Sequence, residues 1–164
     1  MRKPKATSAE GRRAALVANY FEKTGLLEWV AHNVIIGGIH GDDMDDVFPP
    51  PDSEDRGPMQ ADFEAVGVKS RAQFEKLAVA MPATVLGVLR GNVRGNGTNK
   101  QKACVLMLGW QLGCELIEWM GGTGAFFETK GFFEGKRDED LEDVEEAYRA
   151  ACAMLRMSVA YVGQ

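Results

Sequence analysis

The sequence predicts an all-α fold, a compact bundle of five to six helices around a central helix at about residues 99–121. Residues 103–110 are apolar at nearly every position, and a helix of this composition needs neighbours on most of its sides. Apolar residues also recur at three- and four-residue steps from Leu141 to Val162, which indicates a second long helix. The 164 residues are 45% hydrophobic and 26% charged, as is usual for one globular domain.

We expect a single helical domain over residues 1–164, with a flexible basic start at residues 1–6. The longest apolar run is shorter than the roughly 18 residues of a membrane span, and the start lacks the apolar core of a secretory signal. These features predict a cytoplasmic protein without a membrane partner. The three cysteines have no CxxC pairing and are expected to be reduced and buried: Cys104, Cys114 and Cys152.

The first two helices are expected in direct succession. Thr7 or Ser8 provides an N-cap for the first helix, and Gly25 stops it. Leu26 begins the second helix, whose apolar residues share one face, and the glycines at 37–38 end it.

Residues 39–58, IHGDDMDDVFPPPDSEDRGP, predict a long exposed acidic loop. The prolines remove backbone donors and the carboxylates repel one another. Loops of this length within a compact domain are usually functional or disordered.

A short helical turn is expected at about residues 60–66, and Ser70 with Gln73 has the spacing of a capping box for a clearer helix. Pro82 is expected to end this helix or to begin the next one, which fades at residues 90–91. A basic linker rich in glycine and asparagine leads from there to the central helix.

Thr98 or Asn99 is expected to cap the central helix, and the glycines at 121–122 end it. Gly109 and Gly113 lie four residues apart on one face, where the missing side chains would allow a neighbouring helix to approach closely.

The segment after the central helix repeats Phe-Phe-Glu within a glycine-rich stretch, which predicts a possible short hairpin at residues 125–134. Asp138 is expected to cap the last helix.

The sign of the net charge alternates along the chain. It is +4 in residues 1–25, −8 in 40–64, +6 in 69–102 and −8 in 115–146. Such segregation reflects either internal pairing of acidic and basic segments or separate faces with different partners.

The sequence predicts a non-enzymatic protein-binding module of the adaptor, chaperone or inhibitor type that presents an acidic surface to a basic protein partner. With two histidines and no GxSxG elbow, it offers no evident catalytic residue, and no cofactor is expected. The expected partner-binding residues are acidic: Asp42, Asp43, Asp45, Asp46, Asp52, Glu54, Asp55, Glu142, Glu145 and Glu146.

A first alternative is a nucleic-acid or phosphate binder. Cations interleaved with glycines could hold an anion beside the amino end of the central helix, although the Gly-Lys-Ser/Thr of a phosphate-binding loop is missing. The candidate residues are Arg90, Arg94, Lys100 and Lys102.

A second alternative is a metal-dependent enzyme. An imidazole followed by aspartates offers ligands for a cation, but the spacing does not fit the EF-hand loop. The candidate ligands are His40, Asp42, Asp43, Asp45 and Asp46.

A possible homodimer is expected to use one face of the chain's carboxyl-terminal part, formed by Met154, Met157 and Tyr161. Core filling is the alternative role for such residues.

Overall fold

The computed structural model describes residues 9–33, 60–113 and 137–159, and these residues form six α-helices and no strand. This confirms the predicted all-α bundle. The helices are α1 (Ala9–Thr24), α2 (Leu26–Asn33), α3 (Gln60–Ala65), α4 (Arg71–Leu89), α5 (Asn99–Gly113) and α8 (Arg137–Leu155). The predicted acidic loop at 39–58 and hairpin at 125–134 lie outside the described residues.

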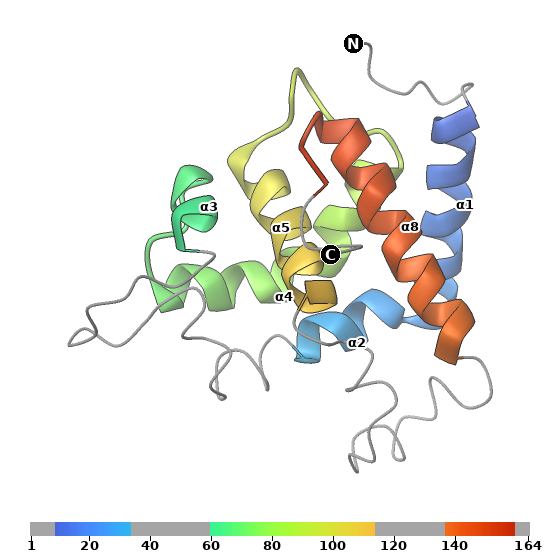
Figure 1. Ribbon diagram of the computed structural model, residues 1–164, viewed down its shortest axis with the longest axis horizontal. Coiled ribbons are helices and arrows are strands. Elements are labelled where there is room, and N and C mark those ends of the chain that lie inside the picture. Colours follow the sequence, from blue (N-terminus) through green and yellow to red (C-terminus); the bar gives the residue numbers. More distant parts are fainter. Residues whose placement is uncertain (1–8, 34–59, 114–136, 160–164) are drawn as a thin grey trace.

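Helices α4 and α5 pack against each other in the middle of the bundle (Figure 1). Helix α8 lies against both of them, and α1 lies beside α8 and α4. Helix α2 crosses below and contacts α1 and α4. The short helix α3 stands at the end of the molecule opposite α1 (Figure 1), so a surface between α3, α4 and α5 is far from α1.

Helix α5 is the most completely covered helix in the described part of the chain. Every residue from Ala103 to Trp110 is buried, including Val105 and Leu108, which are fully inaccessible. The predicted central helix is therefore confirmed as far as Gly113, and its predicted continuation to residue 121 lies outside the described residues.

Gly109 lets α8 approach α5 closely, as its place in the apolar face predicts. A Cβ atom at this position would lie 2.6 Å from the ring of Tyr148, which is closer than two carbon atoms can approach. Tyr148 on α8 is itself fully buried. The side-chain environment of Gly113 is not described.

The predicted break at Pro82 is wrong, because α4 runs without interruption from Arg71 to Leu89 with Pro82 buried inside it. Proline removes one helical hydrogen bond and crowds the preceding turn. Around it, Ala78, Met81 and Val85 are all fully buried. Packing against α1, α2, α5 and α8 therefore outweighs the local penalty.

Helix α4 is also, among the described residues, the one helix whose length and composition would suffice to cross a membrane. Its buried residues belong to the same core cluster as those of α5. We therefore treat it as a core helix.

Two capping arrangements fix the starts of α4 and α5. The Ser70 hydroxyl accepts a hydrogen bond from the backbone N–H of Gln73 at 3.2 Å, as predicted. At α5 the cap is Thr98: its hydroxyl accepts from the N–H of Gln101 at 3.1 Å, and the Gln101 side chain accepts from the N–H of Thr98 at 3.0 Å. This is a complete capping box.

The end of α1 agrees with the prediction from the sequence, whereas both ends of α8 differ from it. Helix α1 ends at Thr24 because Gly25 adopts a left-handed conformation, with φ of 71°, as expected. Helix α8 begins at Arg137, one residue before the predicted cap Asp138. It stops at Leu155, where Arg156 turns to a φ of 54°, so the predicted extension toward Val162 is wrong as far as residue 159.

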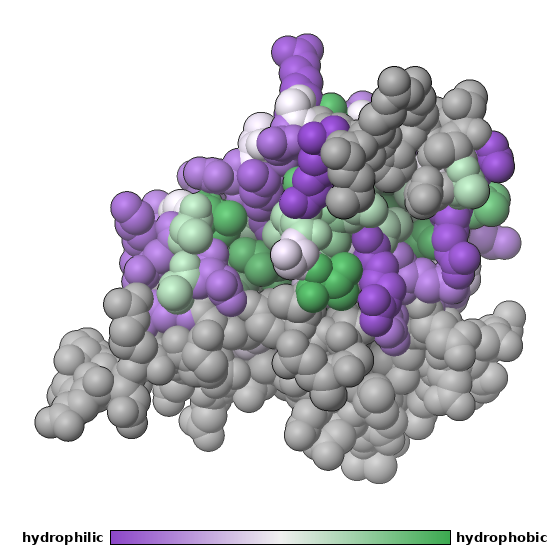
Figure 2. Space-filling model, turned by 45° about the horizontal axis from the view of Figure 1, so that its top comes forward, coloured by the Kyte–Doolittle hydropathy of each residue, from purple (hydrophilic) through white to green (hydrophobic). Residues whose placement is uncertain are grey.

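The surface carries both polar and apolar residues. In the face shown in Figure 2, hydrophobic residues form a strip that hydrophilic residues border on both sides. Among the described residues, the exposed large hydrophobic side chains are Leu16, Val79 and Val159, which lie on or beside three different helices.

Candidate functional site

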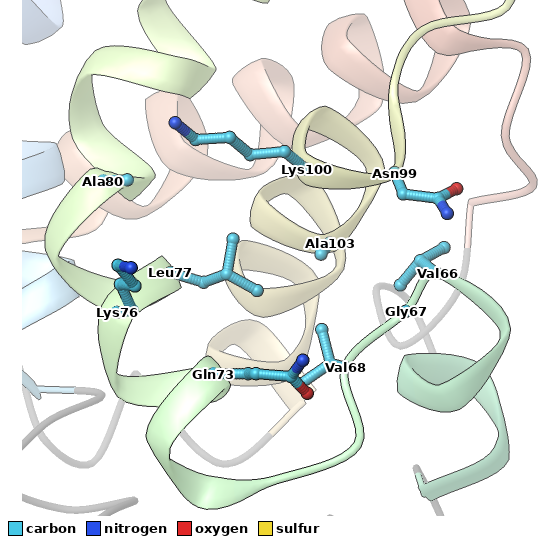
Figure 3. A pocket seen from close by; sticks show the side chains of 10 residues that line it. All are labelled: Val66, Gly67, Val68, Gln73, Lys76, Leu77, Ala80, Asn99, Lys100 and Ala103. Atoms are coloured by element: carbon cyan, nitrogen blue, oxygen red, sulfur yellow. The ribbon is translucent and has the colours of Figure 1, made fainter.

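An open groove of about 690 Å³ lies where the α3–α4 linker, the first half of α4 and the start of α5 meet (Figure 3). Three short stretches of chain supply its lining: residues 66–68, 73–80 and 99–103. The groove is open to solvent.

The floor of the groove is aliphatic. Ala80 and Leu77 of α4 and Val66 of the linker are partly exposed there, whereas Val68 and Ala103 are buried and lie beneath the groove surface. The apolar lining residues are Val66, Val68, Leu77, Ala80 and Ala103. The floor can therefore cover aliphatic side chains of an occupant.

The polar lining residues are two lysines and two amides, namely Lys76, Lys100, Gln73 and Asn99. Figure 3 shows Lys100 extending from α5 toward the turn of α4 that carries Ala80, while Asn99 points to the other side, near Val66. No carboxylate occurs among the ten lining residues. Within the described part of the chain, neither lysine has a carboxylate within ion-pair distance.

Gln73 has a defined orientation at the edge of the groove. Its side-chain oxygen accepts a hydrogen bond from the backbone N–H of Lys69 at 2.7 Å. Because the oxygen is used in this way, the amide nitrogen of Gln73 is left as a donor. The groove thus offers donors and positive charge, in addition to apolar surface.

A series of aromatic rings fixes the wall of the groove. Phe63 of α3 packs edge-on against Phe74 of α4 at a centroid distance of 5.3 Å, and Phe74 packs against Trp110 of α5 at 5.5 Å. The N–H of Val68 also donates to the carbonyl of Phe63 at 2.9 Å. These contacts connect α3 and the start of the α3–α4 linker to the core residues of α4 and α5 next to the groove.

Of the four predicted anion-binding residues, the structure places Lys100 alone in the groove lining. Arg90 instead forms an ion pair with Glu22 of α1 and reaches the Asn19 side chain at 3.4 Å. Arg94 is exposed in the linker before α5, and Lys102 is partly buried in the first turns of that helix. Arg90, Arg94 and Lys102 are therefore not part of the groove lining.

The linker before α5 is held in place by its neighbours. The Gln101 side chain donates to the carbonyl of Asn92 at 2.6 Å. A Cβ atom at Gly97, which has a φ of 86°, would lie 2.4 Å from the Leu155 side chain. Gly97 therefore serves the packing against α8, whereas a Cβ atom at Gly95 would meet nothing within 4 Å.

Two of the predicted acidic partner-binding residues take part in ion pairs within the molecule. Glu145 pairs with Arg149 one turn later at 3.3 Å, and Glu146 pairs with Arg13 of α1. The other members of this set lie outside the described residues, or, for Glu142, have an undescribed side chain.

The predicted metal ligands, His40 and its neighbouring aspartates, also lie outside the described residues. Within residues 9–33, 60–113 and 137–159, no three His, Cys, Asp or Glu side chains come together in a way that could hold a metal ion.

The methionines of the predicted dimer face lie in or against the core. Met154 is 6% exposed, and Met157 is partly buried against the same core cluster. Tyr161 lies outside the described residues. The two methionines therefore have the core-filling role that was the alternative.

Cys104 and Cys152 are buried, unpaired thiols. Burial raises the pKa of each thiol to about 11. A hydrogen bond with Thr84 and the charge of Lys100 lower the pKa of Cys104, but burial dominates. Both thiols are thus protonated at neutral pH and are poor nucleophiles.

Neither protein-family models nor curated proteins nor solved structures gave a match to this chain.

Groove residues Gln73 and Lys76 were missed by sequence reasoning. The signal available was their spacing with Leu77 and Ala80, which places all four residues on one side of a helix. The spacing could not show that this side meets the start of α5.

Proposed function

We propose that this protein is a non-enzymatic protein-binding module, of the adaptor, chaperone or inhibitor type, that takes a segment of its protein partner into the groove between α3, α4 and α5. The observation that carries the proposal is the groove's combination of aliphatic residues with two lysines that have no carboxylate partner among residues 9–33, 60–113 and 137–159. Protein-binding surfaces commonly pair an apolar centre with a polar rim.

An open groove between helices suits a protein segment better than a small molecule. Sites for small ligands are usually concave enough to cover most of the ligand's surface. A peptide chain, by contrast, can place apolar side chains on the groove floor and leave its other side in water. The open form of this groove therefore favours a segment of a protein.

A nucleic-acid partner is a weaker candidate for this groove. Proteins that bind single strands stack bases on aromatic side chains and follow the backbone with several cations. None of the ten lining residues is aromatic, and Lys100 alone comes from the predicted basic set. The acidic surface predicted for residues 42–55, with its basic partner, stays a separate prediction.

The test is to fill the groove with an aromatic ring. A library of displayed 12-residue peptides is selected on the immobilised full-length chain, and enriched peptides are measured by biolayer interferometry. Ala80→Trp places an indole over the floor and should weaken binding at least about tenfold, or about 1.4 kcal/mol.

The matched control is Ala15→Trp, which makes the same change at an exposed position on α1, at the far end of the molecule. Its peptide affinity should stay within about twofold of the unmodified protein. Circular dichroism of both variants, compared with the unmodified protein, checks that each is folded. Enriched peptides that bind Ala80→Trp and the unmodified chain equally would disprove the groove as the binding site.

A further inference from the structure

We infer that the groove selects acidic partners, specifically protein segments in which aspartate or glutamate residues flank one or two aliphatic side chains. This inference rests on the proposed function and adds the chemistry of the partner. It comes from three features of the groove: the charge at its edge, the size of its floor residues and the direction of its donors.

The charge of the groove is positive and lacks internal compensation in the described part of the chain. Lys76 and Lys100 approach from two different helices, α4 and α5. The nearest acidic side chains in sequence, on α3 and at Glu75, do not line the groove. Two ammonium groups beside an apolar floor attract carboxylates and repel basic segments, which gives selectivity as well as faster association.

The floor sets the size of the apolar side chains that fit. The partly exposed apolar residues of the floor are Val66, Leu77 and Ala80, all of them aliphatic. Such a surface covers a leucine, isoleucine or valine and offers no ring for stacking. The hydrophobic gain from covering one such side chain is about 1.5–3 kcal/mol.

The donors at the edge of the groove reinforce the preference for acceptor groups. The Gln73 oxygen is engaged by the N–H of Lys69, so the Gln73 amide presents its N–H groups. Carboxylate oxygens can accept from this amide and from both lysines. A lysine or arginine of the partner would instead face the two ammonium groups, and the like charges would repel each other.

The experiment uses the same 12-residue peptide library with the full-length chain and its Lys76→Glu/Lys100→Glu variant. The unmodified chain should enrich peptides with acidic residues on either side of leucine, isoleucine or valine. These peptides should bind the double variant at least about tenfold more weakly, and their affinity should fall as salt is raised. The double variant should enrich peptides containing lysine or arginine.

Lys23→Glu/Arg156→Glu is the matched control, because it changes the net charge equally at two exposed positions away from the groove lining. It should leave peptide affinity within about twofold. If enriched peptides lose binding to Ala80→Trp but are not acidic, or bind Lys76→Glu/Lys100→Glu unchanged, the groove binds proteins and the inferred chemistry is wrong. If no enriched peptide is sensitive to Ala80→Trp, the proposed function fails as well.

Discussion

Gly109 determines how closely α5 and α8 can pack. Its hydrogen leaves room for the Tyr148 ring, whereas any Cβ atom would overlap with three atoms of that side chain, the nearest at 2.6 Å. The neighbouring helical glycine, Gly87 on α4, differs: the nearest atoms to a Cβ there belong to Asn92 at 3.9 Å, an ordinary contact distance. The two glycines therefore have opposite expected responses to alanine.

Gly109→Ala should lower the free energy of unfolding by about 1–3 kcal/mol, because the buried Tyr148 ring or the α8 backbone must shift. Gly87→Ala should raise it by about 0.4–1 kcal/mol, since alanine fits there and restricts the unfolded chain. Urea unfolding monitored by circular dichroism measures both. Equal effects of the two substitutions would show that α8 does not pack against Gly109 as described.

Single residues differ in how far the sequence predicts their roles. Gly109 and Ser70 were predictable because a helical glycine in an apolar face and a serine three residues before a glutamine have local physical meanings. Lys76 looked like any exposed lysine on a helix. Its role depends on the apposition of α4 and α5, which no local pattern encodes.

Among the elements, α5 is the helix whose start is fixed most completely. Thr98 and Gln101 exchange two hydrogen bonds, and Gln101 also binds the carbonyl of Asn92. These bonds satisfy backbone groups that the first turn leaves free. They also place the first turn of α5, which carries Lys100, at the edge of the groove.

Thr98→Ala should therefore lower the free energy of unfolding by about 1 kcal/mol, the usual value of an N-cap. Ser158→Ala, at an exposed position beyond the end of α8, is the control and should change it by less than about 0.5 kcal/mol. Thermal and urea unfolding provide the measurement. A Thr98 variant as stable as the control would mean that this capping box does not hold α5.

The elements were predictable in type but less so in extent. Apolar periodicity predicted the helices at Ala9, Leu26 and Asn99, and Gly25 marked the boundary between the first two. The break expected from proline at residue 82 was wrong, because burial of the surrounding residues outweighs a local helix breaker. Apolar periodicity failed at Leu155, because apolar residues beyond that point continue the spacing but not the helix.

At the scale of the whole molecule, some of the charged residues that the sequence groups into acidic and basic segments form ion pairs with one another. Arg13 of α1 pairs with Glu146 of α8, and Arg90 of α4 pairs with Glu22 of α1. These side chains are all more than a third exposed, so each pair contributes about 0–1 kcal/mol. They link α1 to α8 and to α4, whereas Lys76 and Lys100 have no carboxylate partner among the described residues.

The sequence predicted the bundle but could not predict the groove. A buried helix is visible in one stretch of apolar residues, because its composition alone requires cover. The groove combines residues 66–68, 73–80 and 99–103, which come together only when α3, α4 and α5 pack. Its partly exposed apolar residues include Ala80, and alanine in a helix carries no sequence signal of a site.

The most direct test of the account is amide chemical-shift mapping of the full-length, isotope-labelled chain during titration with the strongest peptide from the library selection. We expect the largest shifts at Val68, Leu77, Ala80, Lys100 and Ala103, with small shifts along α1. Large shifts confined to α1, to α8 or to residues away from these three stretches would contradict the assignment of the groove as the binding surface.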